Sequence, residues 1–333
     1  MKIALAFGED RALAAGEPED SVGVEAVRDQ VDAVEEACAS LGWEPRRVLV
    51  GDDLPSVVDP LRAAGPDVVF SMVESIGGDA RREASAAVLF EWLGLPYTGS
   101  PPFALALALR KPLARAALAE AGIAVPRGAV LERGDEPLDL RYPAIVKPSR
   151  EDGSHGIRSE SVVADEAGAR ARAAYVIERY AQPALVEEFV PGRELNVSLL
   201  GPADSPTVLP LREIGFALPD SLPRLVTYEA KWLPGSVEYR GTPSEPVTGP
   251  QELVEVVSET ARAAYRAIGL RDYGRVDIRL DADGTPVVID VNPNPDIAPS
   301  GNLGLAGAAA DVGMSFPDLV AFVVDQALSR RLA

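Results

Sequence analysis

The first third of the chain alternates short apolar runs with amphipathic segments. Residues 3–7, 48–50 and 68–71 are apolar runs bounded by Gly, Pro and Asp, which is typical of buried strands. Val24–Leu41 places apolar side chains at helical spacing. The order strand, helix, strand, helix, strand predicts a small parallel sheet. No Gly-x-Gly-x-x-Gly follows the first strand, so Gly8 is interpreted as a turn glycine.

Beyond Pro101 and Pro102 the pattern changes. We expect helices at 104–109, 113–121 and 166–180, and strands at 144–147, 184–189, 194–200 and 207–214. A long stretch from 218 to 250, rich in Pro and Gly, has no regular pattern. Loops of this length are usually functional lids or disordered segments.

The densest polar pattern lies in two alternating runs around Asp283–Gly284, a strong signal for a hairpin turn. With the turn centred between these two residues, the opposed pairs are Asp277 with Asp290 and Arg275 with Asn292. Side chains two apart share a face, so these four polar residues face one way. The other face is then filled by Val276, Ile278, Ile289 and Val291. Opposed carboxylates repel unless a cation lies between them, and Mg²⁺ takes oxygen ligands. An ordinary solvent-facing strand pair explains the pattern equally well.

Composition narrows the class of protein. The chain has 333 residues, enough for two or three domains, and 47% of them are apolar. Its net charge of −19 argues against a nucleic-acid surface. Only one cysteine is present, Cys38, and it fits the apolar stripe of its helix. Acidic residues follow the first apolar run too early for a secretory signal, and no run is long enough to span a membrane, so we expect a cytoplasmic protein.

A glycine-rich loop follows Lys147, at residues 149–156. Its glycines can bring backbone N–H groups against phosphate oxygens, although many turns look similar. His155 in this loop is the only histidine of the chain. It lacks a visible triad partner, so we expect it to contact phosphate or face solvent rather than act as a general base.

Several motifs together resemble one family. Arg275-Val276-Asp277, followed by Asp290-Val291-Asn292-Pro293, is similar to the metal-binding end of ATP-grasp enzymes of the D-alanine–D-alanine ligase branch. Further matches, in the family's order, are LPYTGS at 95–100, IVKP at 145–148, GREL at 192–195, YEAK at 228–231 and GMSF at 313–316. The resemblance covers nearly the whole chain and favours the metal interpretation of the hairpin.

The resemblance implies an α/β fold with the three-domain ATP-grasp architecture: residues 1–101, 102–190 and 191–333, with ATP between the last two. It implies a Mg²⁺ site, with two ions that Mn²⁺ can replace, at Asp277, Asp290 and Asn292. It implies that nucleotide contacts come from Lys111, Lys147, Gly153, Ser154, Gly156, Glu187, Glu188, Val190, Glu194 and Lys231. Glu187 would accept from the adenine amino group and Glu194 would bind the ribose. It implies catalytic roles for Arg275, Lys231 and Ser154, and a lid within 218–235.

The positions that recognise alanine in the family do not match. The aromatic hydroxyl after the lid lysine is replaced by Trp232, and a loop serine by Gly153. The family's His-Gly and Pro-Gly pairs are replaced by Glu74-Ser75 and Pro295-Asp296. The serine that holds the second substrate aligns at or beside Gly301, next to Ser300, and Glu25 is a weak counterpart of the family's amino-terminal acid.

These observations favour an ATP-dependent, ADP-forming ligase that joins a carboxylate to an amine through an acyl phosphate. We expect its partners to be small-molecule acids and amines, in a homodimer, and its use to be small-molecule biosynthesis. Three alternatives are kept open: phosphorylation without ligation, nucleotide binding without turnover, and genuine D-alanine–D-alanine ligation.

Overall fold

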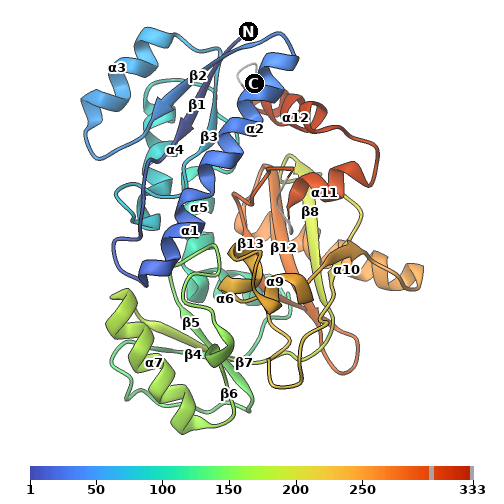
Figure 1. The fold of residues 1–333 in the computed structure, drawn as a ribbon. Coiled ribbons are helices and arrows are strands. Elements are labelled where there is room, and N and C mark those ends of the chain that lie inside the picture. Colours follow the sequence, from blue (N-terminus) through green and yellow to red (C-terminus); the bar gives the residue numbers. More distant parts are fainter. Residues whose placement is uncertain (300–303, 331–333) are drawn as a thin grey trace.

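The computed structural model describes residues 1–299 and 304–330. Three sheets organise it, and they use successive stretches of the chain (Figure 1). The first sheet is parallel, with the order β2-β1-β3, and consists of β1 (Lys2–Phe7), β2 (Glu44–Leu49) and β3 (Val68–Met72). The predicted small parallel sheet is therefore confirmed.

Helices cover both faces of this first sheet. Because side chains alternate along β1, Ile3 and Leu5 contact one helical layer, and Ala4 and Ala6 contact the other. The helices and single turns around it are η1 (Pro18–Asp20), α1 (Ser21–Glu25), α2 (Val27–Ser40), α3 (Leu54–Ala64), η2 (Ala80–Arg82), α4 (Glu83–Trp92) and α12 (Phe316–Ser329). Helix α12 comes from the far end of the chain and packs beside α2.

The second sheet is antiparallel and has the order β4-β7-β5-β6. Its strands are β4 (Gly128–Leu131), β5 (Ala144–Pro148), β6 (Val162–Val163) and β7 (Ala184–Glu188). Helix α7 (Glu166–Tyr180) covers one face, and the turn η3 (Ser159–Ser161) precedes β6. The helix begins where the Asp165 side chain accepts a hydrogen bond from the backbone of Gly168, which satisfies a free N–H of the first turn.

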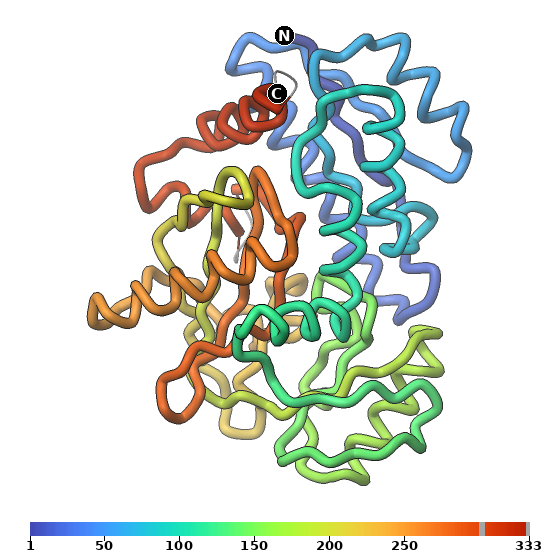
Figure 2. Tube along the Cα trace, turned by 180° about the vertical axis from the view of Figure 1, so that it is seen from behind, coloured from blue at the N-terminus to red at the C-terminus, as the bar shows by residue number. Residues whose placement is uncertain are grey.

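The third sheet has six strands and the order β11-β10-β8-β12-β13, with β9 paired to β8. The strands are β8 (Glu194–Gly201), β9 (Thr207–Val208), β10 (Arg212–Ile214), β11 (Ser244–Pro246), β12 (Asp272–Leu280) and β13 (Pro286–Asn292). One apolar face packs on α5 (Pro102–Leu109), α6 (Lys111–Glu120) and α10 (Gln251–Ile268). Three short helices complete this part: α8 (Tyr228–Trp232), α9 (Val237–Gly241) and α11 (Leu305–Ala310). From behind, α5 and α6 lead the chain from the first sheet towards the second (Figure 2).

The β12–β13 hairpin has the predicted pairs of polar residues, but its register near the turn differs from the predicted one. Asp277 lies opposite Asp290, and Arg275 opposite Asn292. Near the turn Leu280 pairs with Pro286, one position away from the predicted register. A bulge at Ile289 restores the register before the two carboxylates.

The bulge corrects one prediction. Ile289 was expected on the apolar face, but Val288 lies in the core there, opposite Ile278 and beside Val291. The extra residue of a bulge does not pair, so the alternation of side chains shifts by one on its turn side.

Most of the other predicted elements are confirmed, with three differences. The helix expected over Val24–Leu41 breaks at Ala26 into α1 and α2. The strand expected at 207–214 is split, since Pro210 between its two pieces has no N–H for the ladder. The irregular stretch from 218 to 250 contains α8, α9 and β11.

Candidate active site

The polar face of the hairpin forms one wall of the candidate site. Arg275 is buried and donates to both carboxylate oxygens of Asp277, from Nε at 2.7 Å and from a terminal nitrogen at 2.9 Å. Asn196 on the neighbouring strand β8 also donates to Asp277, at 2.7 Å. Asn292 accepts a hydrogen bond from the backbone of Asn294 at 3.0 Å. Asp277 is therefore held in place by two neighbours.

Two lysines reach this wall from other parts of the chain. Lys111 begins α6, and its Nζ lies 3.0 Å from each carboxylate oxygen of Asp290. Burial alone would lower the pKa of Lys111, but the carboxylates of Asp290 and Asp152 raise it. Conversely, burial opposes ionisation of Asp290, but Lys111 and Lys147 together lower its pKa. Both groups are therefore charged at neutral pH.

Lys147 connects the second sheet with the hairpin. Its Nζ lies 2.6 Å from Glu187 on β7 and 3.4 Å from the carbonyl oxygen of Ile289 in the bulge. Lys147 and Glu187 are both buried, although the sequence had assigned the lysine to phosphate and the glutamate to adenine. Each needs the other as a counter-charge when no ligand is present, because a lone buried charge is costly.

Arginines hold the remaining acids of the expected nucleotide site. Arg141 donates to Glu188 at 2.7 Å and 3.0 Å, so this side chain is engaged away from the site and only its backbone remains available. Arg279, which was not anticipated from the sequence, donates to Glu194 at 2.6 Å and to the carbonyl oxygen of Val190 at 2.6 Å. Arg279 thereby fixes Glu194 at the start of the inner strand β8 and Val190 in the segment that precedes it.

The glycine-rich loop has a strained backbone. Gly153, Ser154 and Gly156 all have positive φ angles, of 62°, 61° and 73°. Glycine adopts this conformation freely, whereas serine does so rarely. A side chain at Gly156 would also meet Pro148 at 2.6 Å. Gly153 and Gly156 therefore have backbone conformations that favour glycine, and that the loop presents its N–H groups to phosphate stays a prediction.

The segment around Lys231 is docked onto this loop. Trp232 donates from Nε1 to the carbonyl oxygen of Gly153 at 2.7 Å. Lys231 lies above the indole ring, 4.9 Å from its centroid, and makes no hydrogen bond or ion pair with any residue that the structure describes. Burial and the nearby Arg275 lower the pKa of Lys231. An unpaired cation beside the hairpin suits an anionic ligand.

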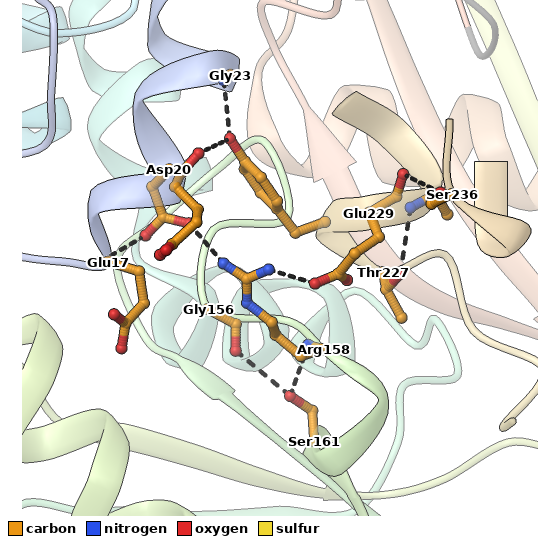
Figure 3. A network of polar contacts seen from close by, with 12 residues as sticks. Glu17, Asp20, Gly23, Gly156, Arg158, Ser161, Thr227, Glu229 and Ser236 are labelled. Atoms are coloured by element: carbon orange, nitrogen blue, oxygen red, sulfur yellow. Dashed lines mark hydrogen bonds and ion pairs between the residues drawn. The ribbon is translucent and has the colours of Figure 1, made fainter. Parts of the chain in front are cut away.

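A polar network ties the same segment to the amino-terminal part of the chain (Figure 3). Arg158 forms an ion pair with Glu229 of α8 and lies 3.5 Å from Asp20, which is fully buried. The hydroxyl of Tyr228 accepts from the backbone of Gly23 at 2.9 Å and donates to the carbonyl oxygen of Glu19 at 2.8 Å. Three distant stretches of the chain therefore meet over the glycine-rich loop.

The structure gives the surroundings of two residues that the sequence singled out. His155 is half-buried: its ring packs on Tyr228 at 5.6 Å between centroids, and its Nε2 is buried without a hydrogen bond to the described residues, while its contact with phosphate stays a prediction. Burial and the charge of Lys231 lower the pKa of His155 to about 4, so the ring is neutral. Glu25, the weak counterpart of the family's acid, is exposed, and the backbone of Gly23 lies beside His155 and Trp232 instead. Ser300 and Gly301 lie outside the described residues.

A cavity of about 450 Å³ opens beside Asn292, which the sequence did not locate. We call it the reaction cavity; its charged lining residues are Glu74, Glu83, Asp152, Lys231 and Asp296. Of these acids, Glu83 and Asp152 were not anticipated, since nothing in their local sequence marks them. Glu74 and Asp296 occupy positions where the family pattern fails, which was the only available signal.

The residues fit the cofactors that the motifs implied. Asp277, Asp290 and Asn292 offer oxygen atoms on one face of a hairpin, the donor set of a hard divalent cation. Within residues 1–299 and 304–330 no group of three His, Cys, Asp or Glu side chains is placed to hold a metal ion, so a site at this hairpin would take the amide oxygen of Asn292 as its third protein ligand. Lys111, Lys147 and the loop backbone supply donors for phosphate oxygens.

Comparisons with known proteins agree with this arrangement. A family model for the D-ala D-ala ligase C-terminus matches residues 119–325. The D-alanine–D-alanine ligase of Gluconobacter oxydans is 32% identical over 302 residues, which cover 90% of this chain and 93% of that one. An uncharacterized Sinorhizobium fredii protein, y4sG, is 35% identical over 274 residues, 82% of this chain and 77% of that one.

A solved structure extends the likeness to the whole fold. The D-alanine–D-alanine ligase of Bacillus anthracis, in complex with ATP, superposes with a TM-score of 0.75 at 20% identity and covers 100% of this chain and 99% of that one. Fold and site together define an ATP-grasp enzyme. The chain belongs to the D-alanine–D-alanine ligase family, which confirms the predicted fold class and the predicted type of enzyme, an ATP-dependent ligase that forms a carbon–nitrogen bond. In the part of the chain that is described, no helix has the length and apolarity to cross a membrane.

Proposed function

We propose that the protein joins a small carboxylic acid to an amine, with ATP as the energy source and an acyl phosphate as the intermediate. The observation that carries the proposal is that Lys111 and Arg275 contact the paired carboxylates of the hairpin, while Lys147 contacts the hairpin backbone beside them at Ile289. Such a cluster of fixed positive and negative groups suits the binding of a metal-bound triphosphate. ATP, Mg²⁺ and small-molecule acid and amine substrates follow from family membership; two ions, replacement by Mn²⁺, and a homodimer remain our predictions.

The chemistry follows from the charges. The substrate carboxylate attacks the γ-phosphorus of ATP, the bond to ADP breaks, and an acyl phosphate forms. Magnesium, when bound, offsets charge on the phosphates. Lys147 and Lys111 stabilise the transferring phosphoryl group, and we expect Glu187 and Asp290 to release them to it. The neutral amine then attacks the carbonyl carbon and Arg275 stabilises the oxyanion. The carbon–oxygen bond to phosphate breaks, and the proton lost by the nitrogen ends on the departing phosphate.

We propose that the substrates differ from two molecules of D-alanine. In the reaction cavity the only hydrogen-bond donor of the Trp232 side chain is bonded to the carbonyl oxygen of Gly153, so this side chain offers no polar group to a substrate. Glu74 and Asp296 add carboxylates where the family pattern has other residues. Because losing a substrate hydrogen bond costs about 1–3 kcal/mol, several such changes together select a different substrate. A role in small-molecule biosynthesis, with an amino acid attached to a less usual acid, follows from this difference.

A screen of acid and amine pairs for ADP release tests the proposal. Release that needs both an acid and an amine, with a new amide in the product, supports ligation. Acyl-phosphate formation without any amine product would mean phosphorylation alone, and nucleotide binding without ADP release would mean a regulator.

Genuine D-alanine–D-alanine ligation is the second candidate, because relatives with that name align over about nine tenths of the chain. A steady-state assay with D-alanine as the only amino acid separates the two. A sub-millimolar KM for D-alanine would establish this second candidate and overturn the first.

A further inference from the structure

A second cavity adjoins the reaction cavity and extends towards the first sheet. It is open to solvent, with about 530 Å³ of empty space when the solvent at its mouth is included, and it shares Glu74, Asp152, Gly153 and Trp232 with the reaction cavity. We call it the side cavity. The residues that line it alone include Asp10, Leu13, Val24, Val27, Glu151 and His155. A ligand that starts beside Asn292 can therefore continue past Trp232 into this space.

The side cavity is lined by four carboxyl groups and, among the described residues, by no lysine or arginine. Asp152 lies 3.7 Å from Lys111, which is outside the cavity. The other three accept from neutral groups: Asp10 from the hydroxyl of Ser75 at 2.6 Å, and Glu74 from the amide of Gln30 at 3.0 Å. Glu151 likewise accepts from the amide of Gln182 at 2.8 Å. Burial raises the pKa of Glu74 to about 7, which a bound cation would reverse.

An independent feature of the same cavity also calls for a hydrogen-bond donor. His155 lines it, and the buried Nε2 of this residue has no partner in the described part of the chain. With its proton on Nδ1, the neutral imidazole of His155 presents Nε2 as its one acceptor nitrogen, and an ammonium group is a donor only. Burying a polar nitrogen without a partner costs free energy, so a ligand that donates to it gains affinity.

The remaining walls of the side cavity are apolar. Leu13, Val24 and Val27 line it from the amino-terminal part of the chain, and the indole of Trp232 lines it from the lid segment. Such walls suit a chain of methylene groups. In the reaction cavity Lys231 makes no hydrogen bond or ion pair with a described residue, although the charges of Asp296 and Glu74 act on it, and it can accept a substrate carboxylate as partner.

We propose that one substrate is an amino acid with a basic side chain, whose carboxylate faces Lys231 and whose side-chain ammonium group occupies the side cavity near Glu74 and His155. The methylene stem lies along Val24, Val27 and Trp232. This inference rests on the proposed ligase function and names the class of one of its two substrates. It also explains why this chain has an acid, Glu74, where the family has a histidine.

Isothermal titration calorimetry tests the proposal with the full chain, Mg²⁺ and a non-hydrolysable ATP analogue. Lysine is compared with norleucine, which has the same length but no ammonium group, each as the D and the L isomer. We expect one isomer of lysine to bind at least about tenfold more tightly than its norleucine counterpart, as a charged hydrogen bond requires. Equal affinities, or no binding of either lysine isomer, would overturn the proposal.

Two variants test whether the ammonium group of lysine binds in the side cavity. Glu74→Gln and Asp10→Asn should each reduce the preference for lysine over norleucine, whereas Asp283→Asn, in the exposed hairpin turn, should leave it unchanged. A preference that survives in both cavity variants places the ammonium group elsewhere and contradicts the assignment. The ADP-release screen tests the ligase function independently of this inference. If other acid and amine pairs release ADP and lysine shows no preference over norleucine, this inference is rejected and the ligase function stands.

Discussion

Lys111 and Asp290 lie 179 positions apart in the sequence, and both oxygens of the aspartate accept from the lysine at 3.0 Å. The pair joins the start of α6 to the hairpin and places a positive charge where two carboxylates would otherwise repel each other. A cation from solution and the lysine therefore compete for the same aspartate. We expect Mg²⁺ and phosphate to separate the pair, with Lys111 following the phosphate and Asp290 the metal.

Asp290→Asn should abolish ADP production while the protein stays folded. The change removes one negative ligand of the expected metal, and loss of one such stabilising group lowers kcat on the order of 100-fold or more. ADP release at increasing Mg²⁺ concentration measures the effect, and circular dichroism checks the fold. Asp283→Asn, in the same hairpin but at its exposed turn, is the matched control. Unchanged turnover with magnesium would rule out Asp290 as a metal ligand.

Lys231→Ala should lower ligation more than it weakens nucleotide binding. Lys231 is half-buried beside Trp232 on the docked segment, and closure of this segment excludes the water that would hydrolyse an acyl phosphate. The variant should therefore raise ATP hydrolysis without product. The measurement is the ratio of ADP released to amide formed. A ratio that stays at one in the variant would show that Lys231 does not protect the acyl phosphate from water.

The same segment should behave as a lid in limited proteolysis. Cleavage after the exposed Arg224 should be fast in the free protein and slow with a non-hydrolysable ATP analogue and magnesium. Equal protection under both conditions would mean that the segment is fixed structure.

Trp232→Phe should loosen the glycine-rich loop. The substitution keeps an aromatic ring but removes the hydrogen bond to Gly153, which is worth about 1 kcal/mol. Amide hydrogen exchange at residues 152–157 should become faster. Trp92→Phe, at a tryptophan that is 85% exposed, should leave these amides unchanged. Identical exchange in the two variants would show that the bond does not restrain the loop.

Thermal stability should fall as the pH rises, and Glu151 should account for part of the fall. Burial raises the pKa of Glu151 from 4.5 to about 8, so the folded protein holds this proton more tightly than the unfolded chain does. The resulting stabilisation is complete below pH 4.5 and is lost as the pH rises through about 8. Glu151→Gln cannot titrate and should reduce the decrease in Tm across this range. Glu160→Gln, at an exposed glutamate, should keep the wild-type slope, and equal slopes in both variants would contradict the assignment.

The part of the site that depends on local sequence could be predicted. Alternation in a strand has a period of two, and Asp283–Gly284 marks a turn, so Asp277 and Asp290 could be placed opposite each other without a structure. The bulge at Ile289 could not be foreseen, because its register depends on how the sheet packs and not on the residue itself.

Contacts between segments that are distant in the sequence could not be predicted from the local pattern of apolar and polar residues. Asp20, Arg158 and Glu229 belong to three separate stretches, and nothing near any of them indicates the other two. The same holds for His155, which local sequence placed in an open loop, whereas Tyr228 from the lid segment covers it. Burial of such a residue is decided by the partner that packs on it.

Helix α12 has a consequence for the order of folding during synthesis. Its side chains Leu319 and Val323 share a core with Ile3 and Leu5 of the first strand. When the ribosome has made the first hundred residues, one face of the first sheet still lacks this helix. Apolar surface on a nascent chain invites aggregation until it is covered. The amino-terminal part of the molecule therefore completes its core only after residues 316–329 have emerged, so this face of the first sheet is exposed for most of the chain's own translation.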